Sequence, residues 1–413
     1  MLTGPHMHCL IFCAGTDGDC FPVFTLARHL RRRGHRVTVM APPVYSGSPV
    51  LGDIAFLPLC TMREYARFIA DAKMLAGRYG LLFCRDHAVR WNLNAWRAIE
   101  SLNARDLLVL APDQPFFWAD VAAKLQWGCA AVRFQVDPPK PPVPAATSAH
   151  LPYGRIQQHL AAALALRWHE VAAAAGLTAN AASLASLNRE RLKVPVIALW
   201  PDWLVGERGE GAGNVRRFGF LLPDAGCQSV AETPDLPPMK GHAIFKMGRT
   251  DSWPRLFYET AIVACRKLGM RGLLLGGTPP CGDLPPEIVW RRFVPLDRAL
   301  ENAAVIVHNG GIGTSAAAIG HGVPQIVVPV WIAQPGIAEW MRRLGVAAVL
   351  PPDKYTAPAL CRQIGWLTGS GGHRKRSLEL SSLIDSHADS AKICEFLESN
   401  AEQHTSEDRR RIS

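Results

Sequence analysis

The sequence lacks the marks of several large protein classes. No apolar run reaches the roughly 20 residues that a membrane-spanning helix needs. The 11 cysteines include no Cys-x-x-Cys pair, and the 14 histidines show no His-Glu-x-x-His spacing. Reduced core thiols are therefore expected, and no tight metal site. Charged residues make up only 19% of the chain against 48% hydrophobic residues, which is the balance of a globular protein.

The N-terminal residues and the net charge narrow the location and the partners. Residues 1–8 show no basic-then-apolar signal pattern, so a cytoplasmic location is the default expectation. The net charge is +10, yet no nucleic-acid-binding motif is present. We therefore expect no nucleic acid partner, and a basic surface that attracts anionic nucleotides or makes peripheral contact with an anionic membrane.

The order of apolar runs indicates an α/β fold with parallel sheets, because short buried runs alternate with helical ones. Residues 36–41, 243–247 and 304–308 are predicted strands, and 254–268 is a predicted helix. Residues 15–22 are expected to form a loop. The Pro-, Gly- and Asp-rich stretch 223–241 separates two similar-sized halves, so we expect domains at 1–222 and 242–399. The last helix can pack back on the first domain, and 400–413 is expected to be a flexible tail.

The densest group of functional candidates follows the predicted strand 304–308. There His308 leads into Asn309-Gly310-Gly311-Ile312-Gly313-Thr314 and an Ala-rich helix. Glycines let the backbone approach a ligand, and the N–H groups of a helix start favour an anion. Thr314 can cap this helix and bond a phosphate oxygen, and His308 can donate to the same group. The alternative is a tight strand–helix turn without a ligand.

The segment from His308 to Gln334, HNGGIGTSAAAIGHGVPQIVVPVWIAQ, resembles the nucleotide-sugar motif of family 1 glycosyltransferases. The segment AGTDGDCFP from Ala14 to Pro22 is similar to the first loop of the bacterial members, and their natural-product and rhamnosyltransferase-like branch looks nearest. The resemblance implies a GT-B fold, in which two Rossmann-like domains face a central cleft. The first domain would bind the acceptor and the second the nucleotide sugar.

The resemblance also implies donor-binding roles in the second half. Gly310, Gly311, Gly313 and Thr314 would hold the diphosphate together with His308. The backbone of Val294 would pair with the nucleobase, on which Phe293 would stack, although Phe293 can equally be a core residue. Arg249 and Thr250 would lie near the phosphates, with a solvated surface arginine as the alternative for Arg249. The expected co-substrate is a UDP- or dTDP-linked sugar, and no cofactor is expected.

In the first half, the resemblance makes Asp19 the candidate catalytic base that takes a proton from the acceptor. Two alternatives remain open. Asp19 can instead cap the following helix, and Asp17 is a nearby competitor for the role of base. Tyr65, Phe68, Trp91 and Trp96 make this half aromatic-rich, which fits an apolar acceptor or ordinary core packing.

One position departs from the family pattern. Family members usually have Asp-Gln where this chain has Ala333-Gln334, a pair that would hold sugar hydroxyls. The function expected is thus an inverting, metal-independent hexosyltransferase-type glycosyltransferase (EC 2.4) acting on a small lipophilic natural product or lipid. The alternatives are a sugar-nucleotide epimerase and a non-catalytic GT-B homologue, for which Ala333 is the best support.

Overall fold

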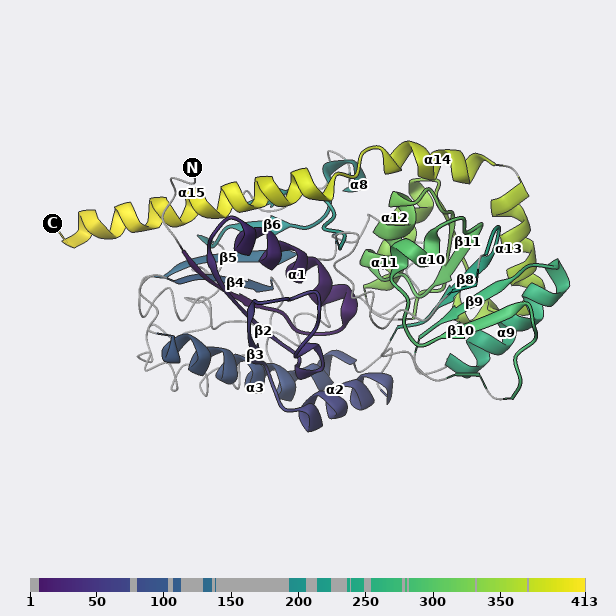
Figure 1. Ribbon diagram of the computed structural model, residues 1–413, viewed down its shortest axis with the longest axis horizontal. Coiled ribbons are helices and arrows are strands. Elements are labelled where there is room, and N and C mark those ends of the chain that lie inside the picture. Colours follow the sequence, from purple (N-terminus) through teal and green to yellow (C-terminus); the bar gives the residue numbers. More distant parts are fainter. Residues whose placement is uncertain are drawn as a thin grey trace. The chain divides into compact units, whose positions relative to one another are not determined.

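The structure is a computed structural model of the 413-residue chain. It describes residues 7–74, 80–102, 107–112, 129–135, 138, 193–205, 214–223, 236–237, 239–248, 254–276, 279–280, 282–330, 333–369 and 371–412. The chain forms two compact units (Figure 1). Unit 1 holds residues 1–138, 142–221 and 386–413, and unit 2 holds 139–141 and 222–385.

Unit 1 is built on a parallel seven-stranded sheet in the order β3-β2-β1-β4-β5-β6-β7. Its strands are β1 (His8–Phe12), β2 (Arg36–Ala41), β3 (Ala55–Pro58), β4 (Leu107–Pro112), β5 (Ala130–Gln135), β6 (Val196–Ala198) and β7 (Val215–Arg217). Its helices are α1 (Asp17–Arg32), η1 (Pro43–Tyr45), α2 (Met62–Met74), α3 (Gly80–Ser101), α8 (Asp202–Val205) and α15 (Ser386–Ile412).

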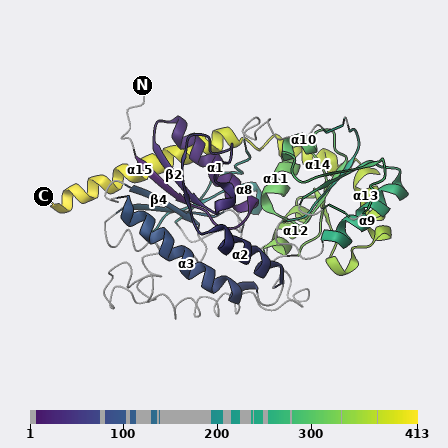
Figure 2. The same ribbon diagram turned by 60° about the horizontal axis from the view of Figure 1, so that its bottom comes forward.

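Alternating residues of β1 place two cores on opposite faces of this sheet. Cys9 and Ile11 pack with residues of α1 and α15, whereas Leu10 and Phe12 pack with residues of α2 and α3. Figure 2 shows α2 and α3 running together along their side of unit 1. The first unit is therefore a sheet covered by helices on both faces, as a parallel sheet requires.

Unit 2 contains a six-stranded parallel sheet in the order β10-β9-β8-β11-β12-β13. Its strands are β8 (Ala243–Lys246), β9 (Gly272–Leu275), β10 (Ile288–Arg291), β11 (Val305–His308), β12 (Gln325–Val327) and β13 (Ala347–Val349). Its helices are α9 (Pro254–Leu268), α10 (Leu296–Leu300), α11 (Ile312–Gly320), α12 (Gln334–Arg343), η5 (Pro352–Lys354), α13 (Ala357–Gly369) and α14 (Gly372–Ser381). This strand order is that of the doubly wound Rossmann fold.

Three features differ from the sequence-based expectations. First, α1 begins at Asp17, inside the stretch expected to be a loop, because Thr16 and Asp19 form a capping box there. Second, α15 continues to Ile412, through the stretch expected to be a flexible tail. Third, the second domain was expected to extend to residue 399, but residues 386–399 belong to unit 1, on which the last helix packs as the sequence allowed.

An ion pair fixes α15 on unit 1. The guanidinium of Arg33 donates through Nε and Nη2 to the two carboxylate oxygens of Glu398, at 2.7 Å each, and His35 Nε2 lies 2.8 Å from Oε1 of the same carboxylate. Leu397 and Ile393 are fully buried beside α1. Side-chain burial and this bidentate contact together explain why the last helix returns to the first unit.

Candidate functional site

The functional candidates of unit 2 lie at the carboxyl edge of its sheet, where β8 and β11 are neighbours. This is the point at which the strand order reverses, and in open α/β sheets ligands bind at such a switch point. His308 and Lys246 are register partners at the ends of these two strands. The loop 309–311 and the start of α11 follow directly from β11.

His308 lies within this edge with no exposed surface. Its Nδ1 accepts the N–H of Gly310 at 3.1 Å, so the ring proton is on Nε2, which donates to Oε1 of Gln325 at 2.9 Å. The Gln325 amide in turn donates to the carbonyl of Ser315 on α11 at 3.2 Å. Burial lowers the pKa of His308 from 6.5 to about 4, and the positive charge of Lys246 adds to this.

These contacts alter the role expected of His308. The sequence predicted that His308 donates to a phosphate, but in the structure both ring nitrogens are engaged with protein atoms. The side chain instead fixes Gly310 and links the end of β11 to α11 through Gln325. A neutral, buried ring of this kind sets the shape of the loop above it.

The glycines of the loop divide into two kinds. Gly310 has a φ of +90°, and a Cβ there would lie 2.8 Å from Cγ1 of Val327, so the fold itself requires glycine. Gly311 has a φ of −66° and is the N-cap of α11. A Cβ on Gly311 would meet only Oδ1 of Asn309, at 3.9 Å, and a Cβ on Gly313 would meet nothing within 4 Å. Open space therefore lies beside these two backbone positions.

The N-terminus of α11 has no side-chain cap. The first intrahelical acceptor is the carbonyl of Gly311, which takes the N–H of Ser315 at 3.0 Å. Thr314, predicted to cap the helix, is instead its third residue and is buried. The cap expectation is wrong because the helix begins two residues earlier than Thr314. The N–H groups of the first turn remain available to an anion.

The candidate nucleobase contacts lie in the loop between β10 and α10. Phe293 is 47% exposed, which excludes its alternative as a core residue, and Val294 is buried. Arg249 and Thr250 lie outside the described residues.

Gln334 is the first residue of α12, and Ala333 is its N-cap. The side-chain Oε1 of Gln334 accepts the N–H of Val330 at 2.7 Å, and the residue is buried. Ala333 itself has no side-chain group to offer a ligand or to cap the helix. The side-chain oxygen of Gln334 is thus engaged with the backbone of Val330.

In unit 1, Asp19 lies in the first turn of α1, beyond the carboxyl end of β1. Its Oδ2 accepts the backbone N–H of Thr16 at 2.8 Å, so the helix-capping interpretation of Asp19 describes what the structure contains. Burial, and to a smaller extent the negative charge of Asp17, raise the pKa of Asp19 from 3.8 to about 6 against the opposing effect of the Thr16 hydrogen bonds. A carboxylate with this pKa can accept a proton near neutral pH.

Sequence reasoning missed the residues that hold this turn. Gly15 has a φ of +111°, and a Cβ there would overlap the Asp19 carboxylate, so only glycine leaves room for it. The Tyr45 hydroxyl donates to Oδ1 of Asp17 at 2.8 Å, and the Tyr65 hydroxyl donates to the carbonyl of Gly15 at 3.1 Å. The clue in the sequence was Gly15-Thr16-x-x-Asp19, a capping box preceded by glycine.

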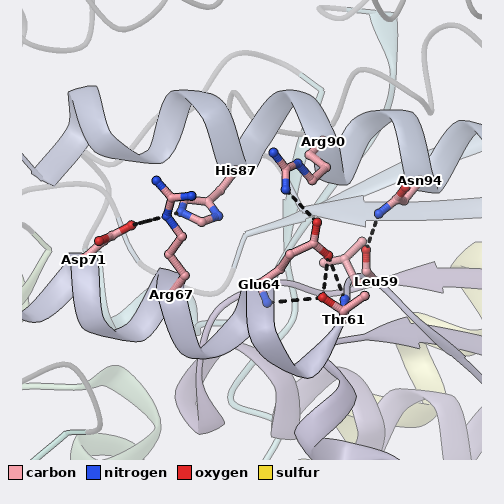
Figure 3. A network of polar contacts seen from close by, with 8 residues as sticks. All are labelled: Leu59, Thr61, Glu64, Arg67, Asp71, His87, Arg90 and Asn94. Atoms are coloured by element: carbon pink, nitrogen blue, oxygen red, sulfur yellow. Dashed lines mark hydrogen bonds and ion pairs between the residues drawn. The ribbon is translucent and has the colours of Figure 1, made fainter.

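The aromatic residues proposed for the acceptor fall into the core under α2 and α3. Tyr65, Trp91 and Trp96 are buried in one cluster, and Phe68 packs against it. Figure 3 shows polar contacts of α2 and α3, in which Arg90 donates to Glu64 at 2.7 Å and Arg67 pairs with Asp71 at 3.5 Å. Both arginines are thus paired with carboxylates of α2.

Asp17 and Asp19 stand in an Asp-x-Asp spacing, and each carboxylate accepts a hydrogen bond from the protein. In the described portion of the chain, no cluster of three or more His, Cys, Asp or Glu side chains could hold a metal ion. The same portion contains no helix long and apolar enough to cross a membrane.

Comparison with known proteins assigns the fold class. The chain has the GT-B fold of two Rossmann-like units. The glycotransferase of kitacinnamycin aligns over 96% of this chain and 100% of its own, with a TM-score of 0.73 and 20% identity. The glycosyltransferase VinC, solved in complex with dTDP, aligns over 96% and 100%, with a TM-score of 0.65 and 17% identity.

Sequence comparison finds a matching family model and several curated relatives. Residues 276–399 match the model for the C-terminal domain of erythromycin biosynthesis protein CIII-like proteins. The chain is 31% identical over 148 residues to O-mycaminosyltylonolide 6-deoxyallosyltransferase of Streptomyces fradiae, which is 36% of this chain and 35% of that protein. It is 35% identical over 103 residues to L-demethylnoviosyl transferase of Streptomyces niveus, which is 25% and 27% of the two chains. The matches span about a third of the length of these curated relatives, and they confirm the resemblance to natural-product glycosyltransferases.

Proposed function

We propose that the protein is an inverting, metal-independent glycosyltransferase that moves a sugar from a nucleoside diphosphate to a hydroxyl of a small lipophilic natural product. The observation that carries this proposal is the pair Gly311 and Gly313. The fold of the chain does not require glycine at either position, since both have room for a side chain. Glycine there leaves space for a ligand against the uncapped start of α11.

The charge at this edge of the sheet fits a diphosphate. The first-turn N–H groups of α11 supply a partial positive charge, and Lys246 adds a full one beside the end of β11. In the reaction the bond between the sugar C1 and the diphosphate oxygen breaks, and negative charge grows on that oxygen. Donors already oriented toward the diphosphate stabilise this charge without a metal ion.

Asp19 supplies the proton acceptor. One carboxylate oxygen, Oδ2, accepts from the backbone N–H and the hydroxyl of Thr16. Oδ1 would take the proton of the acceptor hydroxyl while the acceptor oxygen attacks C1 from the face opposite the diphosphate. This single displacement inverts the configuration at C1 and needs no covalent sugar–enzyme intermediate.

The relatives point to the donor class. VinC is solved with dTDP, and the matched relatives include a 6-deoxyallosyltransferase and a 2-deoxy-L-fucose transferase. Here Ala333 supplies no carboxylate to a sugar hydroxyl. We therefore propose a dTDP- or UDP-linked deoxysugar as the donor.

The test incubates the protein with dTDP- and UDP-sugars, with and without an extract that supplies acceptors, and measures free nucleoside diphosphate. Release that depends on the extract, with a new glycoside of inverted anomeric configuration and no loss of rate in EDTA, is expected. Isomerisation of the sugar without release would identify an epimerase instead. Thermal shifts by dTDP without any turnover would identify a non-catalytic nucleotide-binding protein.

A further inference from the structure

Tyr65 lies behind the turn that carries Asp19. It belongs to α2, is 4% exposed, and its ring stacks on Phe68 with 6.2 Å between the ring centroids. Phe68 in turn meets the Trp91 ring of α3 edge-on, with 5.0 Å between the centroids. Because the ring is packed in this way, the hydroxyl has a fixed position, from which it donates to the Gly15 carbonyl at 3.1 Å.

The Gly15 carbonyl and the Thr16 N–H belong to the same peptide group. The carbonyl accepts from Tyr65, and the N–H donates to Oδ2 of Asp19 at 2.8 Å. This peptide bond is trans, and its C=O and N–H point in opposite directions from a planar, rigid unit. Tyr65 and Asp19 are therefore hydrogen-bonded to the two ends of the same peptide dipole.

Gly15 gives the chain rotational freedom next to this peptide group. Gly15 has a φ of +111°, where the chain turns freely only because no Cβ is present, and the Asp19 carboxylate fills the space of that missing Cβ. A hydrogen bond to the carbonyl also polarises the peptide and makes its N–H a stronger donor. The Tyr65 hydroxyl thus acts on both the direction and the strength of the Thr16 bond.

We propose that Tyr65 is a positioning residue for sugar transfer, which orients the Asp19 carboxylate through the Gly15–Thr16 peptide and strengthens the hydrogen bond that this carboxylate receives. The inference rests on the proposed function, in which Asp19 is the base. Tyr65 itself touches neither the sugar nor the acceptor in this role.

The direction of the effect follows from the groups around Asp19. The Thr16 N–H lowers the pKa of Asp19, whereas burial and the neighbouring Asp17 raise it. Tyr45 of η1 binds Asp17 rather than Asp19, and the thiols of Cys13 and Cys20 are buried close by. Removing the Tyr65 hydroxyl weakens the Thr16 N–H bond, which is the largest of the contributions that favour the carboxylate, so the pKa of Asp19 rises.

The test compares Tyr65→Phe with Tyr355→Phe. Tyr355 is a matched control, because its buried hydroxyl also donates to a backbone carbonyl, that of Phe257 at 3.3 Å, but in unit 2. The measurements are the carboxyl carbon titration of Asp19 by NMR, the pH profile of kcat/KM, and the Kd for dTDP. For Tyr65→Phe we expect the Asp19 titration and the acid limb of the profile to move up by about half a pH unit to one unit.

The kinetic expectation for Tyr65→Phe is a fall in kcat of about tenfold at pH 6, which becomes smaller at pH 8, with unchanged dTDP binding. Phe68→Leu keeps the hydroxyl but loosens the packing of its ring, and we expect a smaller shift in the same direction. It also provides a second variant if Tyr65→Phe does not fold.

Unchanged Asp19 titration in Tyr65→Phe and Phe68→Leu would overturn the inference. So would an equal shift in Tyr355→Phe, because the effect would then be general destabilisation. The NMR titration does not depend on turnover. If the titration shifts in a protein that transfers no sugar, the inference about Tyr65 holds and the proposed function is wrong. If the enzyme transfers sugar but the titration does not shift, the proposed function holds and the inference about Tyr65 is wrong.

Discussion

The imidazole of His308 connects Gln325 to Gly310. Its Nε2–H donates to Oε1 of Gln325 at 2.9 Å, and its Nδ1 accepts the N–H of Gly310 at 3.1 Å. The ring therefore holds Gly310, the first glycine of the loop 309–311, by a bond that requires the neutral form. The loop at the end of β11 depends on this side chain for its shape before any ligand arrives.

Replacement of His308 tests this dependence. In His308→Ala the Gly310 N–H and the Gln325 carbonyl lose buried partners, and each lost partner costs on the order of 1–3 kcal/mol. We expect the Kd for dTDP, measured by calorimetry, to rise about tenfold or more, because the loop no longer has a fixed shape. His321→Ala is the control, since the His321 ring bonds the Ala317 carbonyl at the C-terminal end of α11, away from the loop 309–311. Equal dTDP affinity in the two variants would contradict the prediction.

The protonation of His308 gives a pH prediction. Burial lowers its pKa from 6.5 to about 4, so the folded protein resists a proton that the unfolded chain binds. The stability contributed by the neutral ring is present above pH 6.5 and is lost as the pH falls through about 4. We expect the urea midpoint to fall over this window more in the wild type than in His308→Gln. Parallel curves for the two proteins would show that the ring is accessible to protons when folded.

The glycines of the loop predict opposite changes in stability and binding. Gly310→Ala has to accommodate a Cβ at 2.8 Å from Val327 with a φ of +90°, so we expect a loss of stability of about 1–3 kcal/mol. Gly313→Ala adds a methyl group where nothing lies within 4 Å, so the melting temperature should stay the same or rise slightly. If the space holds a diphosphate, dTDP binding by Gly313→Ala should fall at least tenfold. Normal binding by Gly313→Ala would mean that the space is solvent.

How far the sequence predicts this molecule depends on the kind of feature. The helix Pro254–Leu268 and the strand Arg36–Ala41 have the predicted bounds, because strong apolar patterns and clear end signals determine them. Strands β6, β7 and β13, each three residues long, were not predicted. The return of the last helix to the first domain was allowed for, but the contact that holds it joins Arg33 and Glu398, which are 365 positions apart, and no local pattern encodes such a pair.

In the candidate site, too, features set by local sequence were predictable and features set by distant contacts were not. The loop after β11 follows from local glycines, so its position at the sheet edge was predictable. The Nε2 atom of His308 is hydrogen-bonded to Gln325, which is 17 positions away. The turn that carries Asp19 is held by the bond from Tyr65 to the Gly15 carbonyl, across 50 positions. Contacts between distant residues decide whether a polar side chain faces a ligand or the protein, and a single sequence does not reveal them.

Asp19→Asn separates catalysis from binding. The amide oxygen can still accept from Thr16, so the turn is expected to persist, but the side chain no longer takes a proton. We expect turnover to fall at least 100-fold with unchanged dTDP affinity, as general-base loss predicts. The wild-type kcat/KM should fall below about pH 6, because burial raises the pKa of Asp19 to about 6. Full activity of Asp19→Asn would exclude it as the base, and Asp17→Asn is then the variant to measure.

Asp19→Asn should also change the thermal stability of the protein. The pKa of Asp19 is about 6 when folded, above its usual 3.8, so folding favours the protonated form. Its contribution is fully present below pH 3.8 and is lost as the pH rises through about 6. Asp19→Asn should therefore melt at a higher temperature than the wild type at pH 7.5, and the difference should shrink as the pH falls to 4. A lower melting temperature at pH 7.5 would show that the ionised carboxylate stabilises the turn.

Ala333→Asp tests the choice of donor. A carboxylate at this N-cap position, next to Gln334, could accept hydrogen bonds from sugar hydroxyls, each worth about 1.5–3 kcal/mol when one partner is charged. We expect the ratio of kcat/KM for a fully hydroxylated dTDP-hexose to that for a dideoxy donor to rise about tenfold to 100-fold. Ala333→Asn is the matched control, because it adds similar volume without the charge and should raise the ratio less. If Ala333→Asp improves both donors equally, the carboxylate acts through the cap of α12 rather than through the sugar. If the ratio falls, the deoxysugar assignment is wrong.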